Sequence, residues 1–417
     1  MGEISREEKL RSIAAKRYLG ETSQESLALK NRPDHFPELD YFLSLLEGDL
    51  SPQRVAERVQ KPLVALMCLQ APLELFHALG FHPFKIFGGS VVTTRLSSPV
   101  LPPVMCPMLR SALGALMLDR SGEDGNSPWK AWVAPTTCDW VVKLDDLLEL
   151  CGIKNGCPSH RLELPHLKDR PESQERWLEE IYALKKFLLG VIGQKKLAAK
   201  DLQRSMEVYQ KAFKAFSALI DLKRAGKISL AYFLAIANSF FFAGIEEWTE
   251  NLKKILPKLK EEKPRQGPKV FLAGSPIFFP NLKMPHLLEE AGLVVVMDDL
   301  CSSERLFPGA AFFDDLSEHG LLKALAQRYH QGCLCPTFAD NDRRVNNIIA
   351  PAHKDLYLGV VFHVLKGCHP FDLESLSLEP KLKDEGLKFI KLETDYTAED
   401  SGTLLTRLEA FRSSLAN

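Results

Sequence analysis

The sequence lacks the short motifs that bind nucleotides or carry out hydrolysis. It contains no G-x-x-x-x-G-K-[ST] stretch, which excludes a P-loop, and no G-x-G-x-x-G stretch, so a standard dinucleotide site is not indicated. Neither G-x-S-x-G nor H-E-x-x-H occurs, which removes the signatures of α/β-hydrolases and zinc metalloproteases. The chemistry of this chain must come from residues outside these local motifs.

An excess of charge of either sign is also missing. The 417 residues carry 53 Lys and Arg against 54 Asp and Glu, for a net charge of −1. Nucleic acid is a polyanion that selects strongly basic surfaces, so this balance argues against it as a partner.

The first residues, MGEISREEKLRSIAAKRYLGE, are charged and helix-like and have no apolar run typical of a signal peptide. We therefore expect a cytoplasmic protein whose nine cysteines are reduced rather than paired in disulfides. One stretch, residues 228–245, has 18 residues without a charge. It is at the lower limit for a membrane span, and Asn238 and Ser239 lie inside it, so it predicts a buried core helix and no membrane contact.

Alternating strand and helix patterns predict an α/β fold with two Rossmann-like parallel-sheet domains. Residues 1–60 read as an N-terminal helical arm. The first α/β domain spans residues 61–170, a helical connector spans residues 171–262, and the second α/β domain spans residues 263–417. The charged, proline-containing run LKEEKPRQGPK (259–269) marks the last of these boundaries.

Five cysteines stand at the ends of predicted elements. Cys68, Cys138, Cys301 and Cys368 each follow an apolar strand closely, and Cys106 precedes a helix. Ligands of open parallel sheets gather at the carboxyl ends of the strands, and a helix N-terminus favours a thiolate. Packing as small apolar side chains is the alternative for each cysteine, but their shared placement predicts convergence on one crevice.

The spacing of the cysteines favours iron–sulfur chemistry over zinc. No C-x2-C pair occurs, although structural zinc sites use such local pairs. The nearest candidates are Cys151-x5-Cys157-x2-His160, whose spacing is unusual for zinc, and Cys333-x-Cys335. Iron–sulfur clusters accept thiolates that are far apart in sequence, so single cysteines with long gaps suit a cluster better.

Seven stretches in the same order resemble the 2-hydroxyacyl-CoA dehydratase and benzoyl-CoA reductase superfamily. They are PLELFHALG (72–80), CPMLRS (106–111), APTTCD (134–139), LAGSPIFFPNLKMPHLLEEAG (272–292), VVVMDDLCSSER (294–305), VLKGCHP (364–370) and LETDYTAEDSGTLLTRLEAF (392–411). The resemblance covers nearly everything from about residue 60 to the C-terminus. It implies an enzyme with two Rossmann-like domains and an iron–sulfur cluster between them.

The resemblance also implies the ligands. Ordinary members hold one 4Fe–4S cluster with three cysteines, which by motif are Cys106, Cys138 and Cys368. The further cysteines of this chain are similar to those of the double-cubane branch, in which six cysteines hold an 8Fe–9S unit. By that resemblance Cys68, Cys106 and Cys138 come from one domain, and Cys301, Cys335 and Cys368 from the other. Cys333 is an alternative to Cys335.

Three functions follow as alternatives. The first is a homodimeric reductase component that reduces small molecules at the double-cubane cluster, with electrons from a separate ATP-hydrolysing 4Fe–4S activator, itself a homodimer. That activator would account for the missing nucleotide motif. The second is a 2-hydroxyacyl-CoA dehydratase or aryl-CoA reductase subunit with a single 4Fe–4S cluster, and the third is a cluster scaffold. The substrate and the acid–base residues are not identified by the sequence; Glu74 and His77 lie in a family motif without a demonstrated role.

Overall fold

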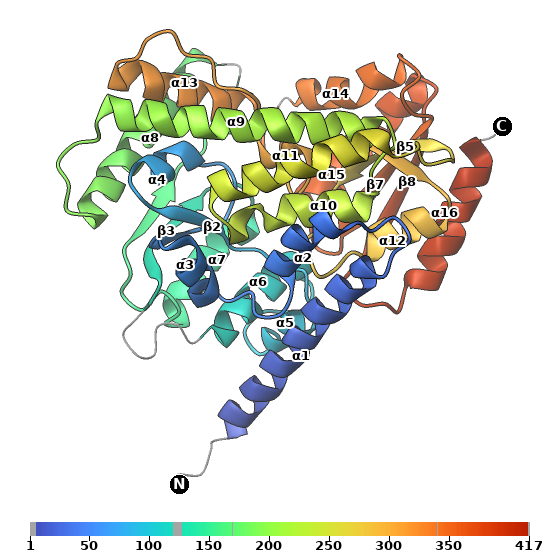
Figure 1. Ribbon diagram of the computed structural model, residues 1–417, viewed down its shortest axis with the longest axis horizontal. Coiled ribbons are helices and arrows are strands. Elements are labelled where there is room, and N and C mark those ends of the chain that lie inside the picture. The colour runs from blue at the N-terminus through green and yellow to red at the C-terminus, as the bar shows by residue number, and fades with distance from the viewer. Residues whose placement is uncertain (1–5, 120–126, 169, 340, 416–417) are drawn as a thin grey trace.

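Two parallel β-sheets joined by helices make up the protein, and the predicted α/β fold with two Rossmann-like sheets is confirmed (Figure 1). The computed structural model describes residues 6–119, 127–168, 170–339 and 341–415. Each sheet has four strands in the same order, second–first–third–fourth along the chain. Both sheets place the carboxyl ends of their central strands toward the region between them.

The first sheet has the order β2-β1-β3-β4, and all of its pairings are parallel. Its apolar strands are buried because helices cover both faces. Strand β4 was not expected, since only one of its four residues is apolar and buried. The elements are β1 (Leu63–Leu66), α4 (Leu73–Ala78), β2 (His82–Lys85), α5 (Val91–Leu96), α6 (Pro107–Leu118), β3 (Trp129–Pro135), α7 (Asp139–Leu150) and β4 (Ser159–Leu162).

The second sheet repeats this arrangement as β6-β5-β7-β8. All seven residues of β7 are buried, as its continuous apolar run predicts for a central parallel strand. The elements are β5 (Lys269–Gly274), α12 (Lys283–Glu290), β6 (Val294–Asp298), η3 (Glu304–Leu306), α13 (Glu318–Gln331), α14 (Asp342–Ala352), β7 (Gly359–Leu365), α15 (His369–Asp384), β8 (Lys388–Thr394) and α16 (Ser401–Leu415).

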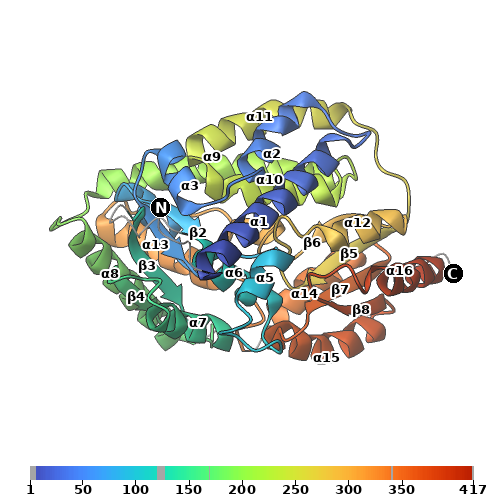
Figure 2. The same cartoon turned by 90° about the horizontal axis from the view of Figure 1, so that it is seen from below.

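Helices make up the N-terminal and middle segments, as predicted. Seen from below, the N-terminal helices and the middle helices α9, α10 and α11 lie along one side of the sheets, α7 and α15 lie on the opposite side, and α8 lies beside β4 (Figure 2). The domain boundaries themselves remain predictions. The elements are α1 (Arg6–Lys30), η1 (Pro37–Leu39), α2 (Asp40–Leu46), α3 (Pro52–Val59), α8 (Pro171–Val191), α9 (Ala199–Arg224), α10 (Leu230–Ser239), η2 (Phe240–Phe242) and α11 (Ile245–Glu261).

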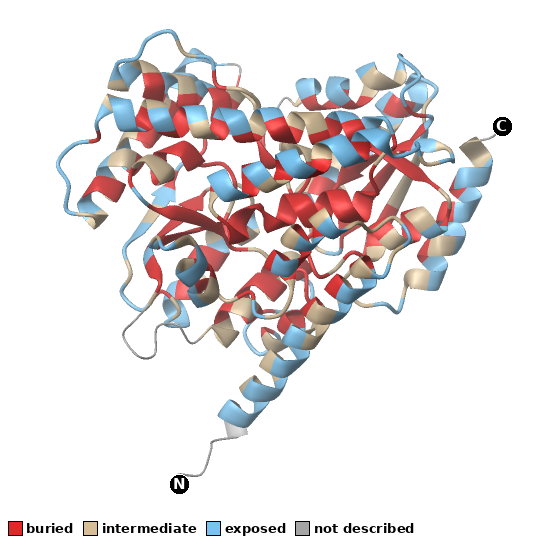
Figure 3. Cartoon of the chain, in the orientation of Figure 1, coloured by how far each residue is buried: buried red, intermediate tan, exposed pale blue. Residues whose placement is uncertain are grey.

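Helix α10 is the buried core helix expected from residues 228–245, and each of its residues is buried (Figure 3). The Asn238 side chain donates to the Ser302 carbonyl at 3.1 Å and accepts from the Phe279 amide at 3.0 Å, so its polar atoms are satisfied inside the core. Within the described part of the chain, no helix combines the length and the apolar character needed to cross a membrane.

Buried ion pairs tie α9 to the second sheet and α4 to α13. Lys223 of α9, with no exposed side-chain surface, contacts Asp298 at the end of β6 and Glu304 at 2.7 Å. Glu74 of α4, also fully buried, pairs with Arg328 of α13 and accepts from the Tyr329 hydroxyl at 2.9 Å. Removing one partner of such a pair leaves a buried charge unpaired, so these contacts hold the helices in register with the strands.

Candidate functional site

Four cysteines follow the carboxyl ends of strands, as predicted. Cys68 lies two residues after β1, and Cys138, Cys301 and Cys368 each lie three residues after β3, β6 and β7. Cys106 is the residue before α6, and Cys138 and Cys368 are likewise the residues before α7 and α15. Each strand end therefore delivers its thiol to the region between the sheets.

Cys106, Cys138 and Cys368 form the first group, which we call the neutral thiol set. The thiols of Cys106 and Cys368 are in hydrogen-bond contact, and Ser275 also hydrogen-bonds to Cys368. Cys138 lies close enough to Cys368 to interact with it electrostatically. Leu365, Tyr396 and Trp140 pack around Cys106 and Cys368, and the pKa of Cys138 and of Cys368 is shifted by burial, by hydrogen bonds and by other thiols, with no basic side chain among the causes.

Two thiols of this set, those of Cys138 and Cys368, are held in their protonated form. Burial, reinforced by the charges of Cys368 and Cys68, raises the pKa of Cys138 to about 12. The hydrogen bond with Cys106, followed by burial, raises the pKa of Cys368 well above its ordinary value. A thiolate at these positions needs a strongly positive partner, and iron in a cluster is such a partner.

Cys68, Cys301, Cys333 and Cys335 form the second group, the cation-faced thiol set. Burial raises the pKa of Cys301, Cys333 and Cys335, and Arg305 counteracts this at all three. Lys85 counteracts it at Cys301 as well, and Lys168 does so at Cys333. Three basic side chains, namely Lys85, Lys168 and Arg305, therefore surround this set.

Sequence patterns did not single out these basic residues. Lys85 is 4% exposed and is the last residue of the buried strand β2, where a lysine beside apolar residues is unusual. Arg305 and Lys168 lie in loop and 3-10 segments whose position beside the thiols depends on tertiary folding.

Cys68 joins the two sets. It interacts electrostatically with Cys138 of the neutral set and with Cys301, Cys333 and Cys335 of the cation-faced set. The double-cubane resemblance implies three thiols from each domain around one region. Within that region Cys368 of the second sheet lies with Cys106 and Cys138 of the first, and Cys68 of the first lies near Cys301, Cys333 and Cys335 of the second.

Gly367 sets the close approach of the two sheets. Its φ is +74°, and a Cβ atom there would collide with the Val104 carbonyl oxygen and lie 3.2 Å from the Cys106 amide nitrogen. The indole of Trp140 donates to the Gly367 carbonyl at 3.0 Å. Only glycine combines this backbone conformation with this contact, so it allows Cys368 to lie beside Cys106.

Within residues 6–119, 127–168, 170–339 and 341–415, no three His, Cys, Asp or Glu side chains converge on a position for a single metal ion. An iron–sulfur cluster does not require ligands that converge on one point, because each of its irons takes one protein thiolate and the ligands are spread around the cluster. Thiols from both sheets, buried or half-buried and all in one region, are a donor set that fits such a group.

Cys151 and Cys157 lie apart from both sets. Cys151 is exposed at the end of α7, and the Cys157 thiol is influenced by Lys130 and Lys154 rather than by another cysteine. With His160 they do not assemble the zinc site that their spacing left open. Cys333, in contrast, is 5% exposed and accepts a hydrogen bond from the Gln70 side chain, and the choice between Cys333 and Cys335 as ligand remains a prediction.

Glu74 and His77 have structural contacts. One carboxylate oxygen of Glu74 pairs with Arg328 and the other accepts a hydrogen bond from the Tyr329 hydroxyl. His77 contacts Ser205 at 2.9 Å and Glu246 at 3.4 Å, both in the middle helices. These contacts attach α4 to α9 and α11 and give neither residue a place among the thiols.

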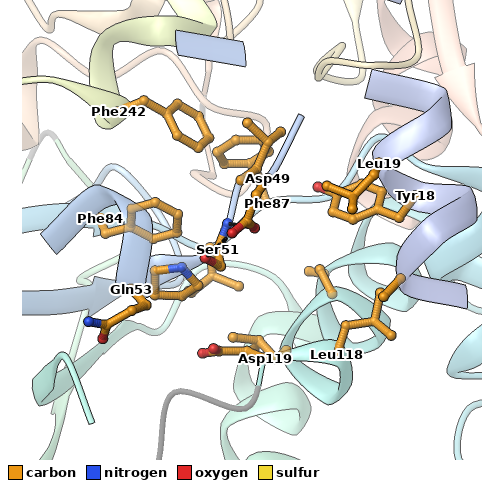
Figure 4. A pocket seen from close by; sticks show the side chains of 17 residues that line it. Tyr18, Leu19, Asp49, Ser51, Gln53, Phe84, Phe87, Leu118, Asp119 and Phe242 are labelled. Carbon is orange, nitrogen blue, oxygen red and sulfur yellow. Dashed lines mark hydrogen bonds between the residues drawn. The ribbon is translucent and has the colours of Figure 1, made fainter. Parts of the chain in front are cut away.

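A cavity of about 440 Å³ lies between α1, the segment before α3 and helix α6 (Figure 4). Its walls are largely apolar, with Phe84, Phe87 and Phe242 on one side and Tyr18 and Leu19 of α1 on the other. None of the nine cysteines, all of which are described, lines it. It is therefore separate from the two thiol sets.

Comparison with known proteins places this arrangement in a family. The sequence profile of "2-hydroxyglutaryl-CoA dehydratase, D-component" matches residues 68–415. The putative dehydratase subunit YjiM of Escherichia coli is 24% identical over 84% of this chain and 90% of its own length. The (R)-phenyllactyl-CoA dehydratase beta subunit of Clostridium sporogenes is 21% identical over 86% and 93%.

A third relative is subunit beta of (R)-2-hydroxyglutaryl-CoA dehydratase from Acidaminococcus fermentans, which is 22% identical over 84% of this chain and 92% of its own length. These names favour the dehydratase alternative over the double-cubane reductase. The resemblance noted in the sequence is confirmed at the level of the superfamily. The match covers most of the chain and includes all seven thiols of the two sets, so the chain belongs to the 2-hydroxyglutaryl-CoA dehydratase D-component family.

Proposed function

We propose that this chain is the cluster-binding subunit of an enzyme of the 2-hydroxyacyl-CoA dehydratase type, with a 4Fe–4S cluster held by Cys106, Cys138 and Cys368. The relatives are named as dehydratase subunits, two of them for (R)-2-hydroxyacyl-CoA compounds. An acyl-CoA carrying a 2-hydroxyl group is accordingly the proposed substrate class, and a second subunit is the proposed partner.

The observation that carries the proposal is the meeting of three thiols from both sheets. Cys106 and Cys138 come from the first sheet and Cys368 from the second, and all three stand immediately before helices. Cys106 touches Cys368, and Cys138 lies near Cys368. This is the same triplet that the family resemblance implies.

A bound 4Fe–4S cluster supplies one-electron chemistry. The residues of this chain would hold and shield it: the three thiols bind, Ser275 hydrogen-bonds to Cys368, and Tyr396 and Trp140 exclude water. Uncharged surroundings disfavour added negative charge and so lower a reduction potential. Delivery of an electron from a separate ATP-hydrolysing activator is part of the proposal for that reason.

One specific observation favours a second candidate, the double-cubane reductase. Cys68 lies near both thiol sets, and the cation-faced set provides further thiols in the same region. In that case Cys68, Cys106, Cys138, Cys301, Cys335 and Cys368 would hold an 8Fe–9S unit, and the chain would form a homodimer.

Anaerobic purification with quantification of iron and acid-labile sulfide tests both candidates. About four irons per chain support the dehydratase-type subunit, and about eight support the double cubane. A preparation that binds no iron after reconstitution with ferrous iron and sulfide would contradict both.

A further inference from the structure

The cavity between α1, the segment before α3 and α6 has the size of a small-molecule site. Its volume of about 440 Å³ lies within the roughly 300–1,000 Å³ typical of ligand pockets. Neither thiol set reaches it, so the proposed cluster gives it no role. Any ligand of this cavity must therefore be selected by the side chains that Figure 4 shows around it.

Three phenylalanine rings form one wall of the cavity (Figure 4). Phe242 packs edge to face with Phe84 and with Phe87, and the ring centroids are 5.6 Å apart in both pairs. Phe84 and Phe242 are buried, so the core holds these two rings in place. The face of an aromatic ring is apolar but carries partial negative charge, so it attracts organic cations as well as hydrocarbon. This wall therefore suits an apolar ligand, and it suits a cation better than an anion.

The opposite wall contributes the hydroxyl of Tyr18, which points from α1 into the cavity (Figure 4). Among the described residues this hydroxyl has no hydrogen-bond partner, so it is available to a ligand. Burial and the negative charges of Glu21 and Asp49 raise the pKa of Tyr18 well above its ordinary value, with no basic side chain among the causes. Negative charge thus dominates where Tyr18 faces the cavity.

The charged side chains of the lining are also acidic. Asp49 and Asp119 line the cavity, and across residues 6–119, 127–168, 170–339 and 341–415 no Lys, Arg or His side chain does. The exposed carboxylate of Asp49 accepts from the Ser51 amide at 2.8 Å and from the Ser51 hydroxyl at 2.9 Å, and neither donor neutralises its charge. Asp119 accepts from the Trp129 indole at 3.3 Å. Asp49 is therefore the charge that this cavity offers to a cation.

Arg54 of α3 is a basic side chain near Asp49, but it binds the main chain. Its Nη1 donates to the carbonyl oxygens of Glu47 and Asp49, at 2.8 Å in each case. Arg54 does not line the cavity. Its positive charge is therefore directed at main-chain oxygens outside the cavity and leaves the carboxylate to a ligand.

We infer that this cavity binds a hydrophobic organic amine in its protonated form, with the ammonium group beside Asp49 and the Tyr18 hydroxyl and the hydrocarbon body against the phenylalanine wall. The same negative charge disfavours organic acids and phosphate-bearing molecules such as coenzyme A esters. The inference goes beyond the proposed function, because it concerns a different ligand and requires no cluster. Binding is measured directly, so its failure is distinguishable from a failure to bind iron.

Isothermal titration calorimetry on the anaerobically purified full-length chain tests the inference at neutral pH. The three probes share one phenylpropyl skeleton and differ in charge: 3-phenylpropan-1-amine, 3-phenylpropan-1-ol and 3-phenylpropionate. One ion pair with an exposed carboxylate and one cation–π contact should make the amine bind at least about fivefold more tightly than the alcohol, and the acid should bind most weakly. A smaller advantage of the amine, an acid that binds more tightly than the alcohol, or no binding of the amine would each overturn the inference.

Asp49→Asn tests the contribution of charge. The amide keeps the size of the side chain and removes its charge, so the affinity for the amine should fall to that for the alcohol, while the alcohol should bind as before. Asp384→Asn makes the same change at the exposed end of α15 and should preserve the preference for the amine. A preference that persists in Asp49→Asn, or that is lost in Asp384→Asn, would contradict the assignment.

Ala115→Trp tests the place of binding. It introduces a large side chain into the cavity from α6 and should abolish binding of the amine. Ala410→Trp is the matched control on the exposed surface of α16 and should bind the amine as the unmodified chain does. Circular dichroism establishes that each variant is folded. If a folded Ala115→Trp keeps its affinity, or Ala410→Trp loses it, the assignment is wrong; if Ala115→Trp does not fold, Asp49→Asn decides, since it changes only an exposed side chain.

Discussion

The two thiol sets use the same chemical group in different electrostatic surroundings. The neutral set packs against Tyr396, Trp140 and Leu365. The cation-faced set lies beside Lys85, Lys168 and Arg305. Net charge and hydrogen bonding set the potential of an iron–sulfur cluster. Iron bound by the neutral set should therefore be harder to reduce than iron bound by the cation-faced set.

The thiols decide which metal group can bind, and the surrounding residues set the reduction potential of the bound group. Apolar side chains surround the neutral set, whereas basic side chains lie beside the cation-faced set. The cation-faced set is suited to stabilise negative charge, whether on a second cubane or on thiolates alone. Changes that affect one set and spare the other test this comparison most directly.

The largest effect is expected from Cys138→Ser, Cys106→Ser or Cys368→Ser in the neutral set. Each should remove essentially all cluster iron, since a hydroxyl is a poor substitute for a thiolate ligand. Iron content and the visible absorption of the anaerobic protein are the measurements. Cys151→Ser, in an exposed residue outside both sets, is the control and should keep full iron. Full iron in any one variant of the neutral set removes that residue from the ligands.

Cys301→Ser tests whether the cation-faced set also binds iron. If only the neutral set holds a cluster, iron stays near four per chain, whereas a double cubane should lose about half of its iron or more. Cys333→Ser and Cys335→Ser, measured in parallel, decide between these two neighbours. A complete loss of iron in Cys301→Ser with a starting content of four would contradict the assignment of the cluster to the neutral set.

Lys223→Met tests the support beneath the cation-faced set. It removes the buried cation that pairs with both Asp298 and Glu304, each three residues from Cys301, and leaves Glu304 with Arg224 at 3.5 Å. We expect a loss of about 3–5 kcal/mol in the free energy of unfolding. Urea denaturation measures it. Lys258→Met removes the exposed partner of Glu38 and should cost less than about 1 kcal/mol. Equal losses in the two variants would show that the buried pair has no special role.

Each sheet also contains one buried histidine that should make the protein sensitive to acid. Burial lowers the pKa of His82 in β2 and of His363 in β7 to about 4, against 6.5 for an ordinary histidine. The unfolded chain therefore binds more protons between these values, and stability falls as the pH drops from about 6.5 to 4.

From pH 7 to pH 5 each histidine should account for a loss of roughly 2 kcal/mol in the free energy of unfolding. His82→Gln and His363→Gln should each remove that part of the pH dependence, as urea denaturation at the two pH values would show. His353→Gln, in a side chain that is 57% exposed, should leave the pH dependence unchanged. An unaltered slope in both buried variants would mean that other groups govern acid unfolding.

Much of the fold could be predicted from local patterns. The continuous apolar run of β7 and the run that ends in Asp298 gave strands at nearly the observed positions. The pattern of SGTLLTRLEAFRSSL (401–415) is typical of a helix, and α16 spans Ser401–Leu415. Strand β4 was missed because a polar edge strand of four residues has no periodic signal of its own.

The thiols could be predicted as a set because strand ends of parallel sheets share an edge. Their division into two groups could not, since it depends on how the sheets face each other across Gly367 and on which loops carry Arg305 and Lys168. Electrostatic surroundings are a property of tertiary contacts. Spacing along the chain therefore predicted which thiols come together but not which charged or apolar side chains surround them.

The glycine before Cys368 has a mechanical consequence. With a carbonyl oxygen of one half pressed against the α-carbon of the other, the gap between the halves is set by main-chain atoms and has no flexible side chain to absorb movement. Gly367→Ala would therefore push the two halves apart and separate the thiols of Cys106 and Cys368, although every cysteine would still be present.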